Sequence, residues 1–106
     1  MNKYTELSDF EINKKVAEKL RLNFKDGVIV KNGEWFYFDP CNSPSDAWQL
    51  LLDAKLSIHP DFNNDCESWI VSNIHIPMVS EANLSRGISI AYLLMKDAEN
   101  EANNKR

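Results

Sequence analysis

The sequence predicts an α+β fold, in which a small antiparallel sheet has two or three helices packed on it. Amphipathic helical segments lie near both ends of the chain, and the stretch between them contains a β-hairpin and further short apolar runs. This mixture of helical and strand periodicities predicts the class. The chain has 106 residues, the length of one domain. We therefore expect a single domain over residues 1–106, with a tail that frays from about residue 100.

The first predicted helix covers about residues 9–21. Ser8 and Glu11 have the spacing of a capping box, in which each side chain bonds the backbone amide of the other residue. Apolar residues then recur at helical spacing, and they are Ile12, Val16 and Leu20. We expect this stripe to face the core. The polar residues should face away, and they are Asn13, Lys14, Lys15 and Glu18.

A β-hairpin is predicted over residues 27–39. The pair Asn32-Gly33 is typical of a two-residue type I′ turn, and it separates a β-branched run from an aromatic run at residues 35–38. Trp35 with Tyr37, and Phe36 with Phe38, should point to opposite faces of the second strand. Because both faces carry rings, we expect this strand to be covered on both sides.

A second helix should begin soon after the hairpin and end near Ala54. Ser43 fits the N-cap, Pro44 the first helical position and Asp46 the third. The expected inward side consists of Ala47, Trp48, Leu51, Leu52 and Lys55.

Short strands are expected at residues 56–59, 66–71 and 74–76, with a turn at residues 72–73. The longest helix then runs from about Glu81 to Glu101. Its apolar surface is wide and consists of Leu84, Ile88, Ile90, Ala91, Leu93, Leu94, Met95 and Ala98. Such a surface indicates either a central helix that covers the sheet or one that also meets a partner. It slightly favours a homodimer through this C-terminal helix.

Composition narrows the classes of function. The formal net charge is −4, and the twelve lysines and arginines form no basic cluster, so we expect no nucleic acid binding. Two cysteines are too few for a disulfide framework. The chain has no signal segment and no apolar run of the ~20 residues that a membrane span needs. We therefore expect a cytoplasmic protein that does not contact a membrane.

Metal sites are not expected. The candidate zinc ligands are Cys41, His59, Cys66 and His75. They lack the close pairs from which most structural zinc sites are built. Asp61, Asn63 and Asp65 are similar to the start of a calcium loop, but Cys66 and Ser72 stand where that loop needs glycine and glutamate. No spacing of a nucleophile, a base and an orienting group is evident either, so we expect no catalytic residue and no cofactor.

The loop at residues 39–46 allows two interpretations. It is either a rigid connection whose polar side chains cap backbone groups, or a recognition surface that its two prolines preorganise. On the second interpretation the partner-binding residues, or residues that support them, are Asp39, Cys41, Asn42 and Asp46. Trp48 would then anchor the following helix in the core and complete the site.

Three blocks of the sequence resemble one phage family. They are residues 7–14 (LSDFEINK), 38–48 (FDPCNSPSDAW) and 91–98 (AYLLMKDA). These blocks are similar to the NinX proteins of lambdoid phages and enterobacterial prophages, a family of unknown function. The last family helix opens with a small-residue pattern around Arg-Ala-Ala, and of that pattern Arg86 alone carries over, within Ser85-Arg86-Gly87-Ile88. The resemblance implies a phage or prophage protein that acts in a bacterial cytoplasm, and it implies no reaction.

We therefore expect a non-enzymatic accessory protein that binds a host or phage protein. The alternative is a small enzyme or nucleotide-binding protein that uses the loop at residues 41–46 with a histidine. An imidazole within hydrogen-bond reach of Cys41, beside an open pocket, would favour that alternative.

Overall fold

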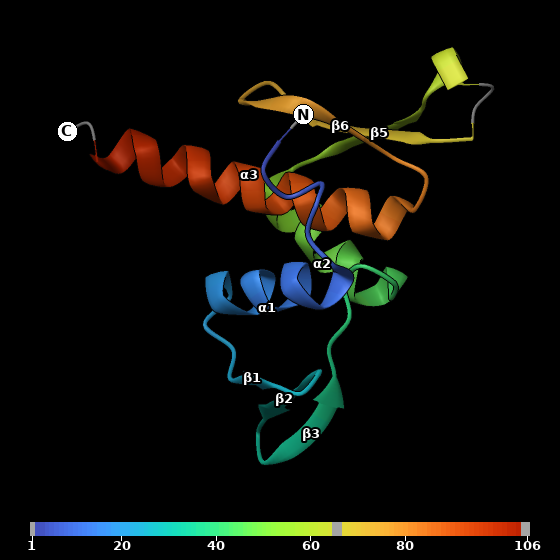
Figure 1. Ribbon diagram of the computed structural model, residues 1–106. Coiled ribbons are helices and arrows are strands. Elements are labelled where there is room, and N and C mark those ends of the chain that lie inside the picture. The colour runs from blue at the N-terminus through green and yellow to red at the C-terminus, as the bar shows by residue number, and fades with distance from the viewer. Residues whose placement is uncertain (1, 65–66, 105–106) are drawn as a thin grey trace.

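The computed structural model describes residues 2–64 and 67–104. Within these residues it confirms the α+β class, with three α-helices and two three-stranded antiparallel sheets where one sheet was expected. The longest helix, α3 (Leu84–Asn104), lies in the middle of the molecule (Figure 1). The sheet formed later in the chain lies on one side of α3, the other two helices lie on its opposite side, and the sheet formed earlier in the chain lies beyond these helices (Figure 1).

Helix α1 (Asp9–Lys19) begins where the capping box predicts. The Glu11 amide donates to Ser8 Oγ at 3.1 Å, and the Ser8 amide donates to Glu11 Oε1 at 3.3 Å. The predicted apolar stripe faces the core, with Ile12 and Val16 fully buried. The expectation that Asn13 faces solvent is wrong. Its side chain is buried and donates a hydrogen bond to Asp39, in the loop that follows the hairpin.

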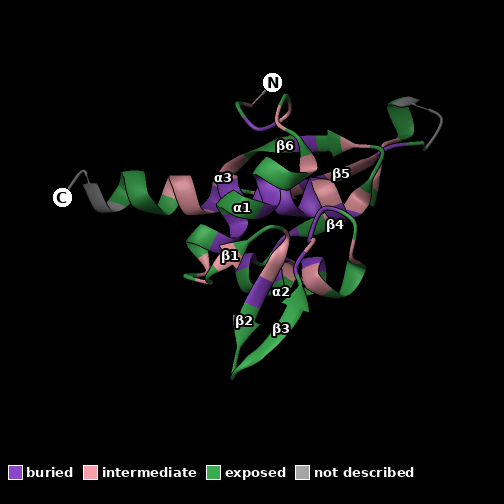
Figure 2. Cartoon of the chain, turned by 60° about the horizontal axis from the view of Figure 1, so that its bottom comes forward, coloured by how far each residue is buried: buried purple, intermediate pink, exposed green. Residues whose placement is uncertain are grey.

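The first sheet has the order β1-β2-β3 and comprises β1 (Phe24–Lys25), β2 (Val28–Lys31) and β3 (Glu34–Tyr37). Asn32 and Gly33 have φ values of 54° and 79°, as a type I′ turn requires, so the predicted hairpin is confirmed. The two-residue strand β1 was not expected. The prediction that β3 is covered on both sides is wrong, because all four of its residues are exposed (Figure 2). The sheet packs against the helices through its inner side, where Ile29 is buried.

Helix α2 (Pro44–Ala54) also begins as predicted, with the Asp46 amide donating to Ser43 Oγ at 3.4 Å. Its inward side differs from the prediction. The buried residues are Ala47, Leu50 and Ala54, whereas Trp48 and Leu52 are half-exposed. Trp48 and Leu52 are four residues apart and lie together on the neighbouring side of the helix. The side of α2 that packs against α3 is therefore not the side that the sequence predicted.

The second sheet has the order β4-β5-β6 and comprises β4 (Ser57–Pro60), β5 (Trp69–Asn73) and β6 (Ile76–Glu81). A short 3₁₀ helix, Phe62–Asn64, follows β4. The turn between β5 and β6 lies at residues 74–75, not at residues 72–73 as predicted. Asn73 ends β5, and its Oδ1 accepts a hydrogen bond from the His75 amide at 3.0 Å, which stabilises the later turn.

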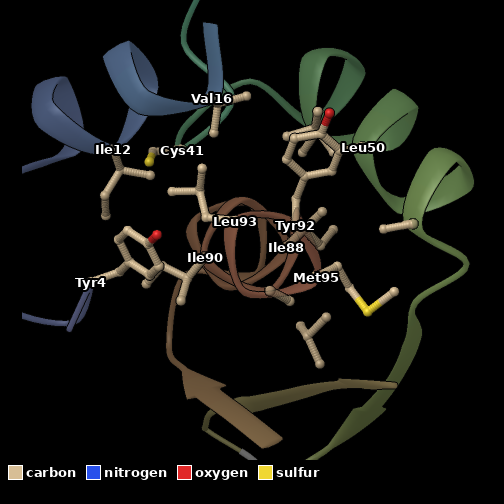
Figure 3. Packing of buried hydrophobic residues seen from close by; sticks show 14 of the residues in the cluster. Tyr4, Ile12, Val16, Cys41, Leu50, Ile88, Ile90, Tyr92, Leu93 and Met95 are labelled. Carbon is tan, nitrogen blue, oxygen red and sulfur yellow. The ribbon is translucent and has the colours of Figure 1, made fainter. Parts of the chain in front are cut away.

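Helix α3 is central because it contacts α1 and α2 on one side and β5 and β6 on the other. A view along its axis shows side chains of the core pointing in all of these directions (Figure 3). Its buried apolar residues are Ile88, Ile90, Ala91, Tyr92, Leu93 and Met95. The wide apolar surface is thus covered within one chain and no longer favours a homodimer. The helix continues to Asn104, beyond the expected fraying point. None of the helices in the described residues combines the length and the apolar composition that a membrane span requires.

Candidate functional site

The loop at residues 39–43, between β3 and α2, is held by the side chain of Asn13 on α1. Asn13 Nδ2 donates to Asp39 Oδ1 at 2.7 Å, and Asn13 Oδ1 accepts from the Cys41 amide at 3.1 Å. Asp46 binds the loop from its other end, because the Asp39 amide donates to Asp46 Oδ2 at 3.1 Å. Two of the predicted site residues, Asp39 and Asp46, therefore stabilise the loop itself, as the first interpretation of this segment expects.

Asn42 connects the same loop to the beginnings of two helices. Its Nδ2 donates to Asp9 Oδ2 at 3.1 Å and to both Asp39 carboxylate oxygens at 3.2 Å. From the segment before α3, Asn83 Nδ2 donates to the Cys41 carbonyl at 2.8 Å and to Asn42 Oδ1 at 3.2 Å. The loop is consequently bonded to α1 and to the start of α3, although these segments are far apart in the sequence.

Arg86 is the charged centre of this arrangement. Its Nη1 donates to Asp9 Oδ1 at 2.6 Å and its Nε donates to Glu81 Oε1 at 3.1 Å. Its Nη2 donates to the carbonyls of Thr5 and Leu7 at 2.9 and 2.8 Å. One planar guanidinium thus joins α3, β6 and the segment that enters α1.

The contacts of Asp9 lower its pKa. Burial alone would raise the pKa of Asp9, but the hydrogen bonds from Asn42 and Arg86 and the charge of Arg86 outweigh burial and hold it below its usual range. A carboxyl group with a depressed pKa in the folded state stabilises the fold above its unfolded pKa, about 3.9 for aspartate. This contribution is lost as the pH falls through the folded-state value.

The pH dependence of stability tests this carboxylate. At pH 7 the unchanged protein is expected to be more stable than Asp9→Asn, and the difference should narrow as the pH falls below about 4. The measurement is the urea midpoint of both proteins between neutral and acidic pH. A difference that keeps its full size in acid would show that the charge of Asp9 contributes nothing.

Cys41 cannot act as an exposed thiolate. Its side chain is 0% exposed, and burial, assisted by the charge of Asp9, raises the pKa of its thiol to about 12. Its Sγ donates to the Asp9 carbonyl at 3.8 Å. Cys41 lies between α1 and α3, on the opposite side of α3 from the second sheet, which carries His59 and His75 (Figure 3). The structure therefore does not bring the predicted thiol and histidines together.

Metal binding has no assembled site within residues 2–64 and 67–104, where no three His, Cys, Asp or Glu side chains are placed to hold an ion. Cys66 and Asp65 lie outside the described residues. The predictions about the zinc set with Cys41, His59 and His75, and about the calcium-like loop at residues 61–65, therefore stay predictions.

Trp48 does not anchor α2 in the core, so that prediction is wrong. Its ring is half-exposed and lines a shallow groove of about 260 Å³ together with Ile58 and Leu84. The groove lies where α2, β4 and the start of α3 meet. Trp48 is thus separate from the hydrogen-bonded loop and available on the surface.

An aromatic surface on the first sheet is the feature that the sequence did not predict as exposed. Val28 pairs with Tyr37 and Val30 pairs with Trp35, so these four residues share one side of the sheet, called here the outer face. Trp35 is 69% exposed and Tyr37 is 87% exposed. No element in the described part of the chain covers them. Because aromatic residues alternate along β3, both sides of the strand are aromatic in the sequence, and the pattern does not predict which side is exposed to solvent.

A pocket of about 390 Å³ lies beside the outer face, where the first sheet meets α1. Its aromatic lining consists of Phe10, Phe24, Tyr37 and Phe38. Its polar lining consists of Asp9, Asn13, Asp39 and Asn42. The predicted loop residues Asp39 and Asn42 are therefore exposed to a common pocket, whereas Cys41, Asp46 and Trp48 do not line it.

Sequence reasoning missed Asn13 and Asn83, which hold the loop. A signal for Asn13 was present, because it lies next to Ile12 and four residues before the buried Ala17. The family pattern did point to Arg86. Gly87 follows Arg86, and an added Cβ at Gly87 would lie 3.3 Å from Val71 Cγ2 on β5. Glycine there allows α3 and the second sheet to approach closely.

Comparison with known proteins identifies one family. The model of the family described as Bacteriophage P22, NinX matches residues 3–96. This match covers the loop, the pocket, the outer face and Arg86. No curated protein and no solved structure matches the chain.

Proposed function

This chain belongs to the bacteriophage P22 NinX family, and from that premise we propose that it is an accessory protein that binds another protein of the phage or its host in the bacterial cytoplasm. The observation that carries the proposal is the outer face of the first sheet. The side chains of Trp35 and Tyr37 are largely exposed there. Exposed aromatic groups of this kind mark interaction surfaces, because their burial in a complex removes a large apolar area from water.

The geometry of β3 supports the same proposal. In the sheet order β1-β2-β3 it is an edge strand, with one side available for a further strand or a packed surface. Trp and Tyr are the residues that most often dominate the energy of a protein interface. A rigid type I′ turn and the ring contacts of Phe24 with Phe10 and Phe38 hold the sheet in place before a partner arrives.

The predicted loop residues take different parts in this proposal. Asp39 and Asn42 line the pocket beside the outer face and belong to the proposed binding surface. Cys41 and Asp46 support it from within, through the bonds that shape the loop. Trp48 lies on a separate groove and forms a second candidate contact. The enzymatic alternative has no observation in its favour, since Cys41 is buried with a raised pKa.

Substitutions on the outer face test the proposal. Trp35→Ala and Tyr37→Ala should each weaken partner binding by about tenfold or more, as expected for a central aromatic contact. Both residues are exposed, so the free energy of unfolding should change by no more than about 0.5 kcal/mol. The measurement is capture of partner proteins from phage-infected bacteria by the tagged chain, quantified by mass spectrometry, with circular dichroism as the check on folding.

Phe62→Ala is the matched control, because Phe62 is also an exposed aromatic residue but lies in the 3₁₀ helix after β4. It should leave capture unchanged. Trp48→Ala separates the two candidate surfaces. If Trp48→Ala is the only substitution that abolishes capture, the partner binds the groove beside α2 and not the outer face. If the tagged chain enriches no protein over a mock capture, the proposal is contradicted.

A further inference from the structure

The pocket beside the outer face contains a carboxylate that has no cation. In the described part of the chain, the Asp39 carboxylate accepts hydrogen bonds only from the neutral side-chain amides of Asn13 and Asn42. The ion pairs formed by the described residues use other carboxylates, and Asp9 in the same pocket pairs with Arg86, whose single positive charge it shares with Glu81. Asp39 therefore leaves one uncompensated negative charge at a partly exposed position.

Aromatic rings surround the same space. Phe10 is half-exposed, and its ring centroid lies 5.5 Å from that of Phe24 at an interplanar angle of 52°. Phe24 in turn contacts Phe38 edge-on at 6.2 Å. The face of an aromatic ring is electronegative and attracts cations, and it also packs against the methylene groups of a long side chain. A carboxylate beside such rings suits a cation that has an apolar stem.

We propose that this pocket receives an arginine side chain of the partner protein. A guanidinium group is planar, so it can stack on a ring and at the same time donate to Asp39 Oδ2, which accepts only one hydrogen bond from the described residues. The Asp39 carboxylate disfavours a phosphate or another anion in the same place. This inference rests on the proposed function, since the pocket lies next to the aromatic outer face that binds the partner.

The first experiment uses a small probe and does not depend on knowing the partner. N-acetyl-arginine amide is titrated into the isotope-labelled protein and followed by proton–nitrogen spectra. The shifts should concentrate at residues 9–13, 24–27 and 38–42. N-acetyl-citrulline amide has nearly the same shape without the charge and should cause much smaller shifts. Equal responses to both probes would overturn the proposal.

Three variants make the probe experiment specific. Asp39→Asn should weaken binding of the arginine probe by about tenfold, because a charged hydrogen bond becomes a neutral one. Glu101→Gln removes the same unit of charge from an exposed site near the end of α3 and should leave the affinity unchanged. Phe10→Leu keeps an apolar side chain without the ring face and should weaken binding about two- to fivefold. If Asp39→Asn fails to fold, Phe10→Leu decides the question.

Partner capture separates this inference from the function on which it rests. If Trp35→Ala abolishes capture and Asp39→Asn weakens it, the proposed function and the arginine pocket are both supported. If Trp35→Ala abolishes capture and Asp39→Asn leaves it intact, the function stands and the arginine pocket is excluded. If neither substitution changes capture, both are wrong.

Discussion

Replacing Arg86 with alanine is expected to lower the free energy of unfolding by about 2–4 kcal/mol. The Arg86 side chain is only 15% exposed and donates to two carboxylates and two backbone carbonyls. Without it, the carboxylate of Glu81, itself 17% exposed, loses its cation. The carbonyls of Thr5 and Leu7 lose a donor as well. Unpaired buried groups are costly, so the melting temperature should fall by about 10 °C or more.

Arg86→Lys separates the charge from the geometry of the guanidinium. Lysine keeps the positive charge but cannot donate to four acceptors as the planar guanidinium does. The free energy of unfolding of Arg86→Lys should therefore lie between those of the unchanged protein and Arg86→Ala. Lys15→Ala is the control for removing a cation, because Lys15 is exposed on α1, and it should change stability by at most about 0.5 kcal/mol. Thermal unfolding of the three variants measures these differences. Equal melting temperatures for Arg86→Ala and Lys15→Ala would show that the Arg86 contacts do not stabilise the fold.

Replacing Leu93 with alanine should have a comparable effect, about 2–5 kcal/mol, for a different reason. Leu93 is fully buried on α3 and points toward Ile12 and Val16 of α1 (Figure 3). Truncation removes apolar contacts and leaves a cavity that the surrounding rigid helices cannot close. Chemical denaturation should therefore show a lower midpoint with a similar dependence on denaturant.

Leu52→Ala provides the matched control. The residue type and the deletion are the same, but Leu52 is half-exposed on α2, so the loss should be well below that of Leu93→Ala. The sequence pattern alone placed Leu52 on the inward side of its helix. A larger loss for Leu52→Ala than for Leu93→Ala would contradict the packing of α2 against α3.

Much of the local structure could be predicted because short-range chemistry determines it. The capping box begins α1, Ser43 and Pro44 begin α2, and Asn32 with Gly33 forms the hairpin turn. In each case the decisive groups lie within a few residues of one another, so one conformation satisfies their backbone bonds whatever the rest of the chain does. The loop at residues 39–46 is local only in part. The bond from the Asp39 amide to Asp46 lies within the segment, whereas Asn13 and Asn83 bind the loop from other elements.

The candidate site could be predicted only in part. Asp39 and Asn42 were recognised as important polar residues, but their shared pocket depends on Phe10 and Phe24 from other elements. Arg86 was singled out only by the family pattern, because its partners Thr5 and Asp9 are about eighty residues away in the sequence. Nothing in local spacing connects groups that meet only when α1 and α3 pack together.

By itself the sequence determined the α+β class, the beginnings of α1 and α2, the hairpin and the family, whereas α3 begins at Leu84 and not at Glu81 as predicted. Tertiary structure alone decided which apolar surfaces are buried. Alternation along β3 and the stripe on α2 show that a segment has apolar sides, but burial depends on what other elements cover them. Here α3 is contacted by α1, α2 and the second sheet, and within residues 2–64 and 67–104 no further element covers Trp35 and Tyr37. The proposed binding surface is therefore a consequence of how the helices share the core, which no single segment encodes.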